Sequence, residues 1–314
     1  LATEDDIFYC FRLLLGRNPE PVEWPGHSSH AGSPLDTVVP IYANSLEFAR
    51  RKLGAANAAS LPVLKALDGF ALYAFEDDGA VGAAVLGGSY EPHVDAVFRR
   101  YIEPGMGVVD LGANIGYFTM LAAHLTGQSG TVYAIEPNPA NARLLEASRR
   151  ANGFANVRLF QMAAGRQTGL LVLNTAYSNG TTAEPAEELH ALLDSVTVPS
   201  MTLDALLHEA PRIDFLKLDI EGAEFHALAG AARVLDAHRP IIVSEFSPPM
   251  LAGVSGASGE DYLRLLVARD YEVSVIGEGG RTRACGADVA AVLRAFDDSG
   301  VDHIDILALP RNTT

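Results

Sequence analysis

Residues 108–119 constrain the fold of this chain more than any other stretch. An apolar run that ends at Leu111 is typical of a strand buried on both faces, and the glycines Gly112 and Gly116 follow it before a segment with helical spacing. A strand that enters a glycine turn and then a helix directs the free N–H groups of the helix toward the turn, where polar or anionic groups bind well. The stretch therefore predicts a nucleotide-sized site in an α/β fold.

Apolar strand candidates alternate with helical patterns after this stretch, which predicts a parallel sheet with helices on both faces. Two extended runs between positions 170 and 200 flank a loop at 174–188, and they predict an inserted hairpin or an edge extension. Its acidic part, 184–188, suits either a solvated loop or a flap over the site. We expect further strands at 131–135, 157–160, 215–218, 241–244, 272–276 and 305–309.

The residues before this sheet predict a smaller helical region. A helix over 4–15 with Thr3 as its cap and a second helix over 35–53 would enclose an irregular segment, and 54–60 would be a linker. We then expect a hairpin formed by 71–75 and 81–86, and a helix over 95–101. The predicted domains are a helical region with its linker over 1–60 and a main domain over 61–314. The chain starts at Leu1 instead of Met, which fits a piece of a longer protein.

The balance of charges bears on possible partners. The chain has 39 acidic against 23 basic residues, a net charge of −16, which opposes a role in binding nucleic acid because that role needs clustered Lys and Arg. No apolar run reaches the length of a membrane span, and no charged-then-apolar leader opens the chain, so we expect a cytoplasmic protein. Cys10 and Cys285 lack metal-ligand spacing and are expected to be free thiols.

The glycine turn differs from the dinucleotide-binding fingerprint. Asn114 stands where a Gly-x-Gly-x-x-Gly pattern requires its second glycine, so a pyrophosphate would be poorly bound. Glu136 follows the next expected strand, and a carboxylate at that place can accept hydrogen bonds from both hydroxyls of a ribose. The pattern favours a nucleoside ligand with a free ribose diol and an amino-acid tail.

A charged cluster follows the expected strand at 215–218. Lys217, Asp219 and Glu221 alternate and would share one face, with Glu224 close behind. Their place at the carboxyl end of a parallel strand is where open sheets bind ligands, which favours a functional site. A structural ion pair of Lys217 with Asp219 or with Glu245 is the alternative.

Three motifs together resemble the FkbM family of S-adenosylmethionine-dependent methyltransferases. They are Asp110-Leu-Gly-Ala-Asn-Ile-Gly116, Ile135-Glu-Pro-Asn138 and Lys217-Leu-Asp-Ile-Glu-Gly-Ala-Glu224. The resemblance covers about 86–309. It implies a Rossmann-like class I methyltransferase fold, with a seven-stranded, mostly parallel sheet whose last strand is antiparallel, and methyl transfer to a hydroxyl oxygen.

The resemblance also implies roles for residues in these motifs. The glycine turn would hold the methionine end of the cofactor, and Glu136 would hold the ribose. Asn138, and Met162 with Ala163 after the following strand, would lie near the adenosine. Met162 could equally be an ordinary core methionine. The expected cofactor-binding residues are Tyr90, Glu91, Asp110, Gly112, Ala113, Asn114, Gly116, Glu136, Pro137, Asn138, Met162, Ala163 and Asp219.

The expected catalytic residues are Lys217, Asp219, Glu221 and Glu245. Asp219 is the leading candidate for the general base, with Glu221 and Glu245 orienting the acceptor or serving as base in its place. Alternatively, Asp219 and Glu245 bind Mg²⁺, which polarises the hydroxyl.

The family and the segment at 11–19, which resembles a helical module found beside bacterial glycan-modifying enzymes, suggest a sugar or glycan acceptor. A polyketide or macrolide hydroxyl is the nearest alternative acceptor. An NAD-linked oxidoreductase and a catalytically silent cofactor-binding module are the alternatives from other classes.

Overall fold

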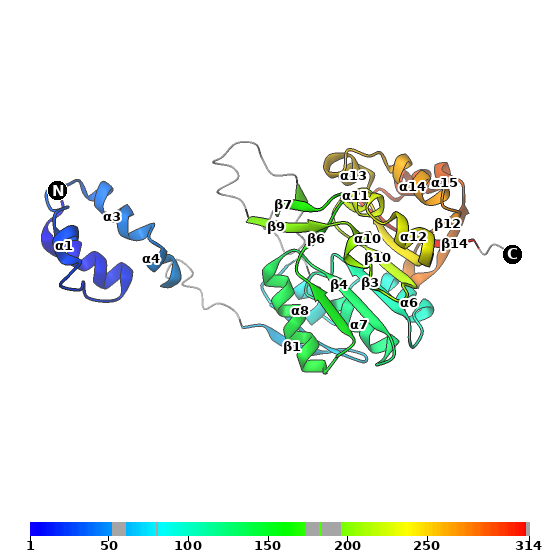
Figure 1. Cartoon of the computed structure of the whole chain (residues 1–314), viewed down its shortest axis with the longest axis horizontal. Coiled ribbons are helices and arrows are strands. Elements are labelled where there is room, and N and C mark those ends of the chain that lie inside the picture. The colour runs from blue at the N-terminus through cyan, green and yellow to red at the C-terminus, as the bar shows by residue number, and fades with distance from the viewer. Residues whose placement is uncertain (52–60, 80, 174–181, 184–195, 312–314) are drawn as a thin grey trace. The chain divides into compact units, whose positions relative to one another are not determined.

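The chain forms two compact units, Leu1–Leu61 and Pro62–Thr314, in the computed structural model (Figure 1). The structure describes residues 1–51, 61–79, 81–173, 182–183 and 196–311. Among these residues, every helix is too short or too polar to cross a bilayer. Each unit has a hydrophobic core of its own.

Helices make up the first unit. A capping box between Thr3 and Asp6 starts α1 (Glu4–Tyr9), which continues as the π-helix η1 (Cys10–Leu15), as predicted for 4–15. Short α2 (Trp24–Ser28), α3 (Leu35–Ala43) and α4 (Leu46–Arg51) complete the unit. Its core contains Ile7, Phe11, Leu15, Val38 and Tyr42.

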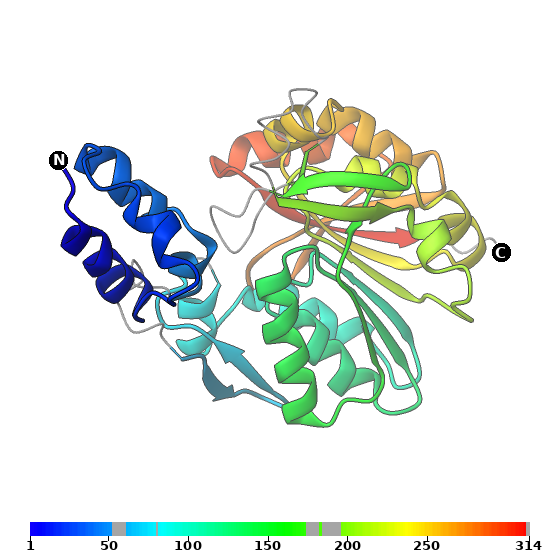
Figure 2. The same cartoon turned by 60° about the vertical axis from the view of Figure 1, so that its left-hand side comes forward.

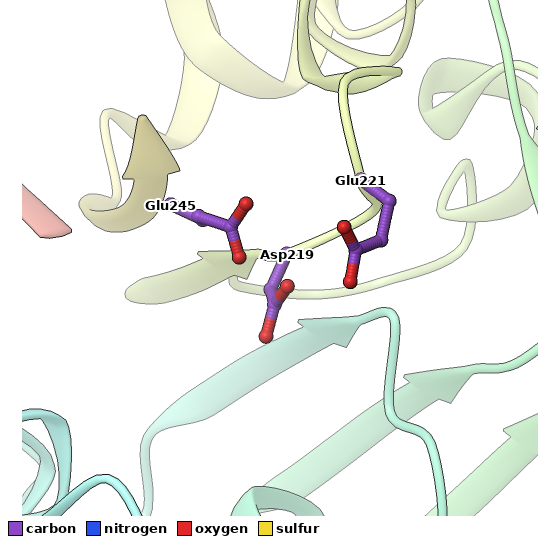
Figure 3. Close-up of side chains that lie close together, drawn as sticks. All are labelled: Asp219, Glu221 and Glu245. Atoms are coloured by element: carbon purple, nitrogen blue, oxygen red, sulfur yellow. The ribbon is translucent and has the colours of Figure 1, made fainter. Parts of the chain in front are cut away.

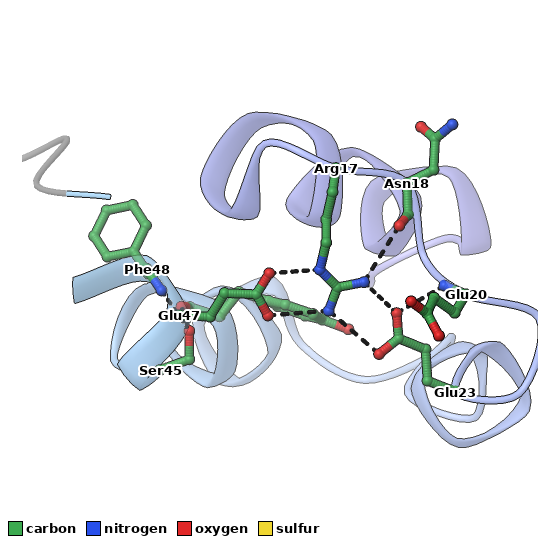
Figure 4. A network of polar contacts seen from close by, with 8 residues as sticks. Arg17, Asn18, Glu20, Glu23, Ser45, Glu47 and Phe48 are labelled. Carbon is green, nitrogen blue, oxygen red and sulfur yellow. Dashed lines mark hydrogen bonds and ion pairs between the residues drawn. The ribbon is translucent and has the colours of Figure 1, made fainter. Parts of the chain in front are cut away.

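The single helix predicted for 35–53 is wrong, because the chain breaks between α3 and α4. The hydroxyl of Ser45 accepts a hydrogen bond from the backbone N–H of Phe48 at 3.1 Å, so Ser45 starts a new helix. Residues 52 and 53, and the predicted linker at 54–60, lie outside the described residues. The Arg17 guanidinium pairs with Glu23 and Glu47 and so ties the loop after η1 to α2 and α4 (Figure 4).

An eight-stranded sheet in the order β13-β12-β14-β11-β10-β3-β4-β5 forms the centre of the second unit. Six strands run in one direction, while β14 and β13 run opposite to them. The predicted seven strands and the antiparallel last strand are confirmed, and β13 is an additional edge strand. The strands are β3 (Gly107–Leu111), β4 (Thr131–Ile135), β5 (Val157–Phe160), β10 (Phe215–Leu218), β11 (Ile241–Phe246), β12 (Tyr271–Ile276), β13 (Thr282–Gly286) and β14 (Ile304–Pro310).

Helices cover both faces of this sheet, as predicted for a class I methyltransferase fold. Side chains along β3 alternate between two cores, with Val108 in one and Val109 in the other. The core on the side of Val108 contains residues of α6 (Pro92–Tyr101), α7 (Tyr117–Thr126) and α8 (Pro139–Asn152). The opposite core contains residues of α10 (Leu203–Leu206), α11 (Glu224–Ala229), α12 (Ala232–His238), α13 (Pro248–Val254), α14 (Gly259–Val267) and α15 (Val289–Ser299).

Two smaller sheets accompany the central one. The hairpin predicted between positions 170 and 200 is confirmed, because β7 (Gly169–Leu173) pairs antiparallel with β9 (Val196–Met201), and Figure 2 shows the two strands side by side. β6 (Ala163–Ala164) and β8 (Thr182–Ala183) complete this sheet. Most of the loop expected at 174–188, including the acidic part 184–188, lies outside the described residues.

The hairpin predicted from 71–75 and 81–86 is wrong. β2 (Ala71–Ala74) pairs instead with β1 (Val63–Ala66), and Gly82–Leu86 forms the short helix α5. The side chain of Asp78 accepts a hydrogen bond from the N–H of Gly82 at 3.1 Å, which favours a helical turn over a strand there. Cys10 and Cys285 are both free, as expected.

Candidate functional site

A cavity of about 260 Å³ lies where β3, β4, β10 and β11 end. Most residues expected at the site line it, and they come from segments more than 150 positions apart in the sequence. Asp110, Gly116, Asn138 and Met162 do not line it. The expected residues that do are Tyr90, Glu91, Gly112, Ala113, Asn114, Glu136, Pro137, Ala163, Lys217, Asp219, Glu221 and Glu245.

The turn after β3 brings the backbone close to β10. Gly112 has a φ of +80°, and a Cβ built on it would lie 1.8 Å from the carbonyl oxygen of Asp219, so only glycine fits. Asn114 also has a left-handed backbone, with φ of +50°. Gly116 caps α7, and a Cβ there would lie 2.8 Å from Cγ of Leu145, so packing against α8 explains this glycine.

Glu136 follows β4 and is held by two backbone groups. Its Oε2 accepts a hydrogen bond from the N–H of Asn114 at 2.8 Å, and its Oε1 accepts one from the N–H of Asn138 at 2.7 Å. The residue is 5% exposed, and this burial raises its pKa to about 7. The carboxyl group is thereby fixed between two turns, with further lone pairs available to a ligand.

Two residues expected near the adenosine have other contacts. The side chain of Asn138 accepts a hydrogen bond from the N–H of Ala140 at 2.9 Å and caps α8. Met162 packs against the hydrophobic core, which agrees with its alternative interpretation as a core methionine, while the neighbouring Ala163 lines the cavity.

A buried lysine connects the strands beneath the cavity. Nζ of Lys217 lies 2.7 Å from Oδ2 of Asp219 and 4.9 Å from the ring centre of Phe118. The ion pair that the sequence left as an alternative therefore exists, inside the cavity wall. Burial disfavours the ammonium, but the carboxylates of Asp219 and Asp110 outweigh it and raise the pKa of Lys217.

Asp110 lies beside Lys217 on the neighbouring strand and is completely buried. Its Oδ2 accepts a hydrogen bond from the hydroxyl of Thr119 at 2.5 Å, and no described residue hydrogen-bonds to its Oδ1. Burial raises the pKa of this carboxyl. Asp110 thus ties β3 to the first turn of α7 and does not line the cavity.

Three carboxyl groups, from Asp219, Glu221 and Glu245, converge at the ends of β10 and β11 (Figure 3). Burial favours neutral Asp219, but the Lys217 ammonium outweighs it and holds the pKa of Asp219 below its ordinary value. Burial and the charge of Asp219 raise the pKa of Glu245 to about 10. The raised pKa of Glu245 favours its neutral form, which can donate a hydrogen bond to the Asp219 carboxylate.

Glu224, the last residue of the charged cluster, shapes the turn that carries this group. Its Oε1 accepts hydrogen bonds from the N–H groups of Ile220 at 2.9 Å and Gly222 at 3.3 Å. Within that turn Glu221 has a left-handed backbone, with φ of +55°. Glu224 is 2% exposed and does not line the cavity, so its contacts are structural.

The three carboxyl groups lie close enough together for one cation, with ligand oxygens within 4.8 Å of one another. A divalent ion there would compete with the Lys217 ammonium for the Asp219 carboxylate and would replace the proton of a neutral Glu245. The magnesium site at Asp219 and Glu245 stays a prediction.

Sequence reasoning missed some lining residues. His303 lines the cavity from the turn before β14, and its Nδ1 lies 2.9 Å from Oδ1 of Asp302. Thr182 of β8 lines it as well. Neither stands in a recognisable motif, and only the folded chain brings them to the carboxyl ends of the parallel strands.

Several solved structures are similar to this chain. They include an FkbM methyltransferase from Methylobacillus flagellatus, with 18% identity over 68% of this chain and 50% of that chain, and a TM-score of 0.41. The O-methyltransferase TomG from Streptomyces achromogenes, in complex with S-adenosylmethionine, has 13% identity over 70% and 78%, with a TM-score of 0.40. A methyltransferase from Aquifex aeolicus has 13% identity over 70% and 89%, with a TM-score of 0.38.

The chain spans only half the length of the Methylobacillus flagellatus chain. No curated protein matches this sequence. The family model for the methyltransferase FkbM domain matches residues 110–273, which is just over half of the chain. The match includes the glycine turn, Glu136 and the carboxyl cluster. The chain therefore belongs to the FkbM family of S-adenosylmethionine-dependent methyltransferases.

Proposed function

We propose that this protein transfers a methyl group from S-adenosylmethionine to a hydroxyl group of a sugar or glycan. The observation that carries the proposal is one cavity that holds both a ribose-type carboxyl, Glu136, and the converging carboxyl groups of Asp219, Glu221 and Glu245. The first suits a nucleoside cofactor, and the others suit an acceptor that offers several hydroxyl groups.

The residues of the cavity fit the cofactor. When bound, S-adenosylmethionine would supply an electrophilic methyl group: an oxygen nucleophile attacks the methyl carbon in line with the breaking carbon–sulfur bond, and neutral S-adenosylhomocysteine is the leaving group. Glu136 would accept hydrogen bonds from the ribose hydroxyls while its two backbone donors keep it in place. Gly112 lets the turn after β3 pack against the Asp219 carbonyl, and the turn lines the cavity where the methionine part would bind.

Asp219 is suited to receive the proton of the acceptor hydroxyl. Lys217 keeps it ionised, so it can accept a hydrogen bond from the hydroxyl and then the proton as the oxygen–carbon bond forms. Glu245 is protonated at neutral pH, so it would orient the acceptor or Asp219 by donating a hydrogen bond, and would not act as base. We therefore assign the base to Asp219 and the orienting role to Glu245 in this proposal.

Each alternative to a sugar methyltransferase requires a different feature of the cavity. A polyketide or macrolide hydroxyl could use the same base, but the carboxyl groups around Asp219 offer more hydrogen-bond acceptors than one hydroxyl needs. An NAD-linked oxidoreductase would need a pyrophosphate site, and Asn114 replaces the glycine that such a site uses. A silent module would bind S-adenosylmethionine but form no methylated product.

Incubation with methyl-labelled S-adenosylmethionine and separate pools of neutral oligosaccharides, sugar nucleotides and polyketides tests the proposal, with mass spectrometry of the products. We expect label on a hydroxyl of a saccharide. The variant Asp219→Asn should reduce turnover by about 10²–10⁴-fold and leave cofactor affinity within about threefold. Asp298→Asn, in the exposed last turn of α15, is the matched control.

Label on polyketides alone would overturn the sugar acceptor while leaving the methyltransferase activity in place. Calorimetric binding of NAD but not of S-adenosylmethionine would overturn the proposal as a whole. Full turnover in Asp219→Asn would remove this residue from the role of base.

A further inference from the structure

Glu91 lies in the cavity wall in a strained conformation. Its φ of 39° and ψ of 61° are left-handed, which costs an L-residue other than glycine free energy and is common at functional sites. Pro92 follows it as the first residue of α6, so the helix start fixes this position. The carboxyl hydrogen-bonds to the hydroxyl of Tyr90, and both side chains line the cavity.

Among the described residues that line the cavity, no basic side chain forms an ion pair with Glu91. Lys217 is the only lysine or arginine among the described residues that line the cavity, and its Nζ is bonded to Asp219 at 2.7 Å. Within the described ranges Glu91 forms no ion pair: the Lys217 ammonium attracts its carboxylate only from beyond ion-pair distance, while Asp219 and Asp305 repel it. Burial raises the pKa of Glu91 to about 7. A positive ligand group would therefore stabilise this carboxylate.

The wall beside Glu91 is aromatic. The ring of Tyr90 lies 5.3 Å from that of Tyr117 and 5.9 Å from that of Phe118, measured between ring centres, and all three residues line the cavity. A sulfonium carries positive charge but no N–H or O–H, so hydrogen-bond acceptors recognise it only through charge, and aromatic rings attract it as they attract other cations. A carboxylate beside aromatic rings matches this chemistry.

We propose that Glu91, with Tyr90, recognises the positive charge of the sulfonium and thereby sets the preference of this protein for S-adenosylmethionine over the neutral product S-adenosylhomocysteine. This inference rests on the proposed use of the cofactor. Methyl transfer removes the charge on sulfur, so the same contact would weaken at the moment when the product must leave.

Calorimetric titration of the full chain with each of the two ligands at neutral pH tests this role without an acceptor. The variant Glu91→Gln keeps the size of the side chain and removes its charge. In the wild type, selectivity is the dissociation constant of S-adenosylhomocysteine divided by that of S-adenosylmethionine. We expect this ratio to fall at least about tenfold in the variant, while the dissociation constant of S-adenosylhomocysteine changes less than about threefold. Retained binding of S-adenosylhomocysteine also shows that the variant is folded.

Glu103→Gln provides the matched control, because Glu103 is exposed, lies just beyond the other end of α6 and does not line the cavity. Its ratio should equal that of the wild type. An unchanged ratio in Glu91→Gln, or an equal weakening of both ligands, would overturn the charge-recognition role. If the wild type binds neither ligand, the cofactor proposal itself fails, so the two failures are distinguishable.

Discussion

Replacing Lys217 by methionine tests how much its buried ammonium stabilises the neighbouring carboxylates. Lys217 is 3% exposed, and its ammonium lies 2.7 Å from Asp219. At an effective dielectric constant of about 20, Coulomb attraction at that distance is about 6 kcal/mol, and the cost of burying both charges offsets much of it. Methionine would leave Asp219 and the fully buried Asp110 without their cation. Removing one partner from a buried ion pair typically costs about 3–5 kcal/mol, and we expect a loss of that size in unfolding free energy.

Urea denaturation followed by far-UV circular dichroism measures this loss. Arg264→Met removes a cation from an exposed pair with Glu260 and should cost less than about 1 kcal/mol. A loss for Lys217→Met no greater than that for Arg264→Met would show that the buried ammonium does not stabilise the two carboxylates.

Further predictions concern the glycine turn and the response to pH. Gly112→Ala should abolish cofactor binding, because the new Cβ would overlap the Asp219 carbonyl. Gly153→Ala is the control, since Gly153 also has a left-handed φ but open space around it, and it should bind the cofactor normally. Equal cofactor affinities of the two variants would contradict this contact. Glu136 is protonated below its pKa of about 7, so calorimetry should show cofactor affinity falling as the pH drops through that value. Glu136 and Glu224 both have folded pKa values of about 7, above the ordinary 4.5, so the stability they contribute is complete below about pH 4.5 and is lost as the pH rises through about 7. Urea titrations of the ligand-free protein should therefore give a lower unfolding free energy at about pH 8 than at about pH 6, and an increase would contradict the assignment.

Much of the main unit is predictable because its strands are short and buried on both faces. Such strands appear in the sequence as apolar runs, and the runs at 131–135, 157–160 and 215–218 coincide with β4, β5 and β10. The roles of Gly112 and Glu136 are also predictable from the sequence, because each residue directly follows a strand. The turn needs a residue without a Cβ, and the ribose needs a carboxylate.

The errors arise where local sequence is ambiguous. Gly82–Leu86 is a five-residue apolar segment, too short for its periodicity to separate a helix from a strand, and the hydrogen bond from Gly82 to Asp78 decides in favour of the helix. The break before α4 depends on the hydroxyl of Ser45, which also could have pointed to solvent.

Parts of the site depend on tertiary structure alone. His303 reaches the cavity only because β14 lies beside β11, which the local sequence does not show. Glu224 appears in the same charged motif as Asp219, yet its carboxyl is used by two backbone N–H groups of its own turn. A motif thus identifies the segment, while the geometry separates ligand-facing from structural carboxyl groups.

A crystal structure with S-adenosylhomocysteine bound would locate the cofactor site directly. We expect the nucleoside in the cavity at the ends of β3 and β4, with both ribose hydroxyls donating hydrogen bonds to the Glu136 carboxylate and the sulfur on the side of Glu91 and Asp219. A ligand bound elsewhere, or a Glu136 that keeps only its contacts to Asn114 and Asn138, would contradict it.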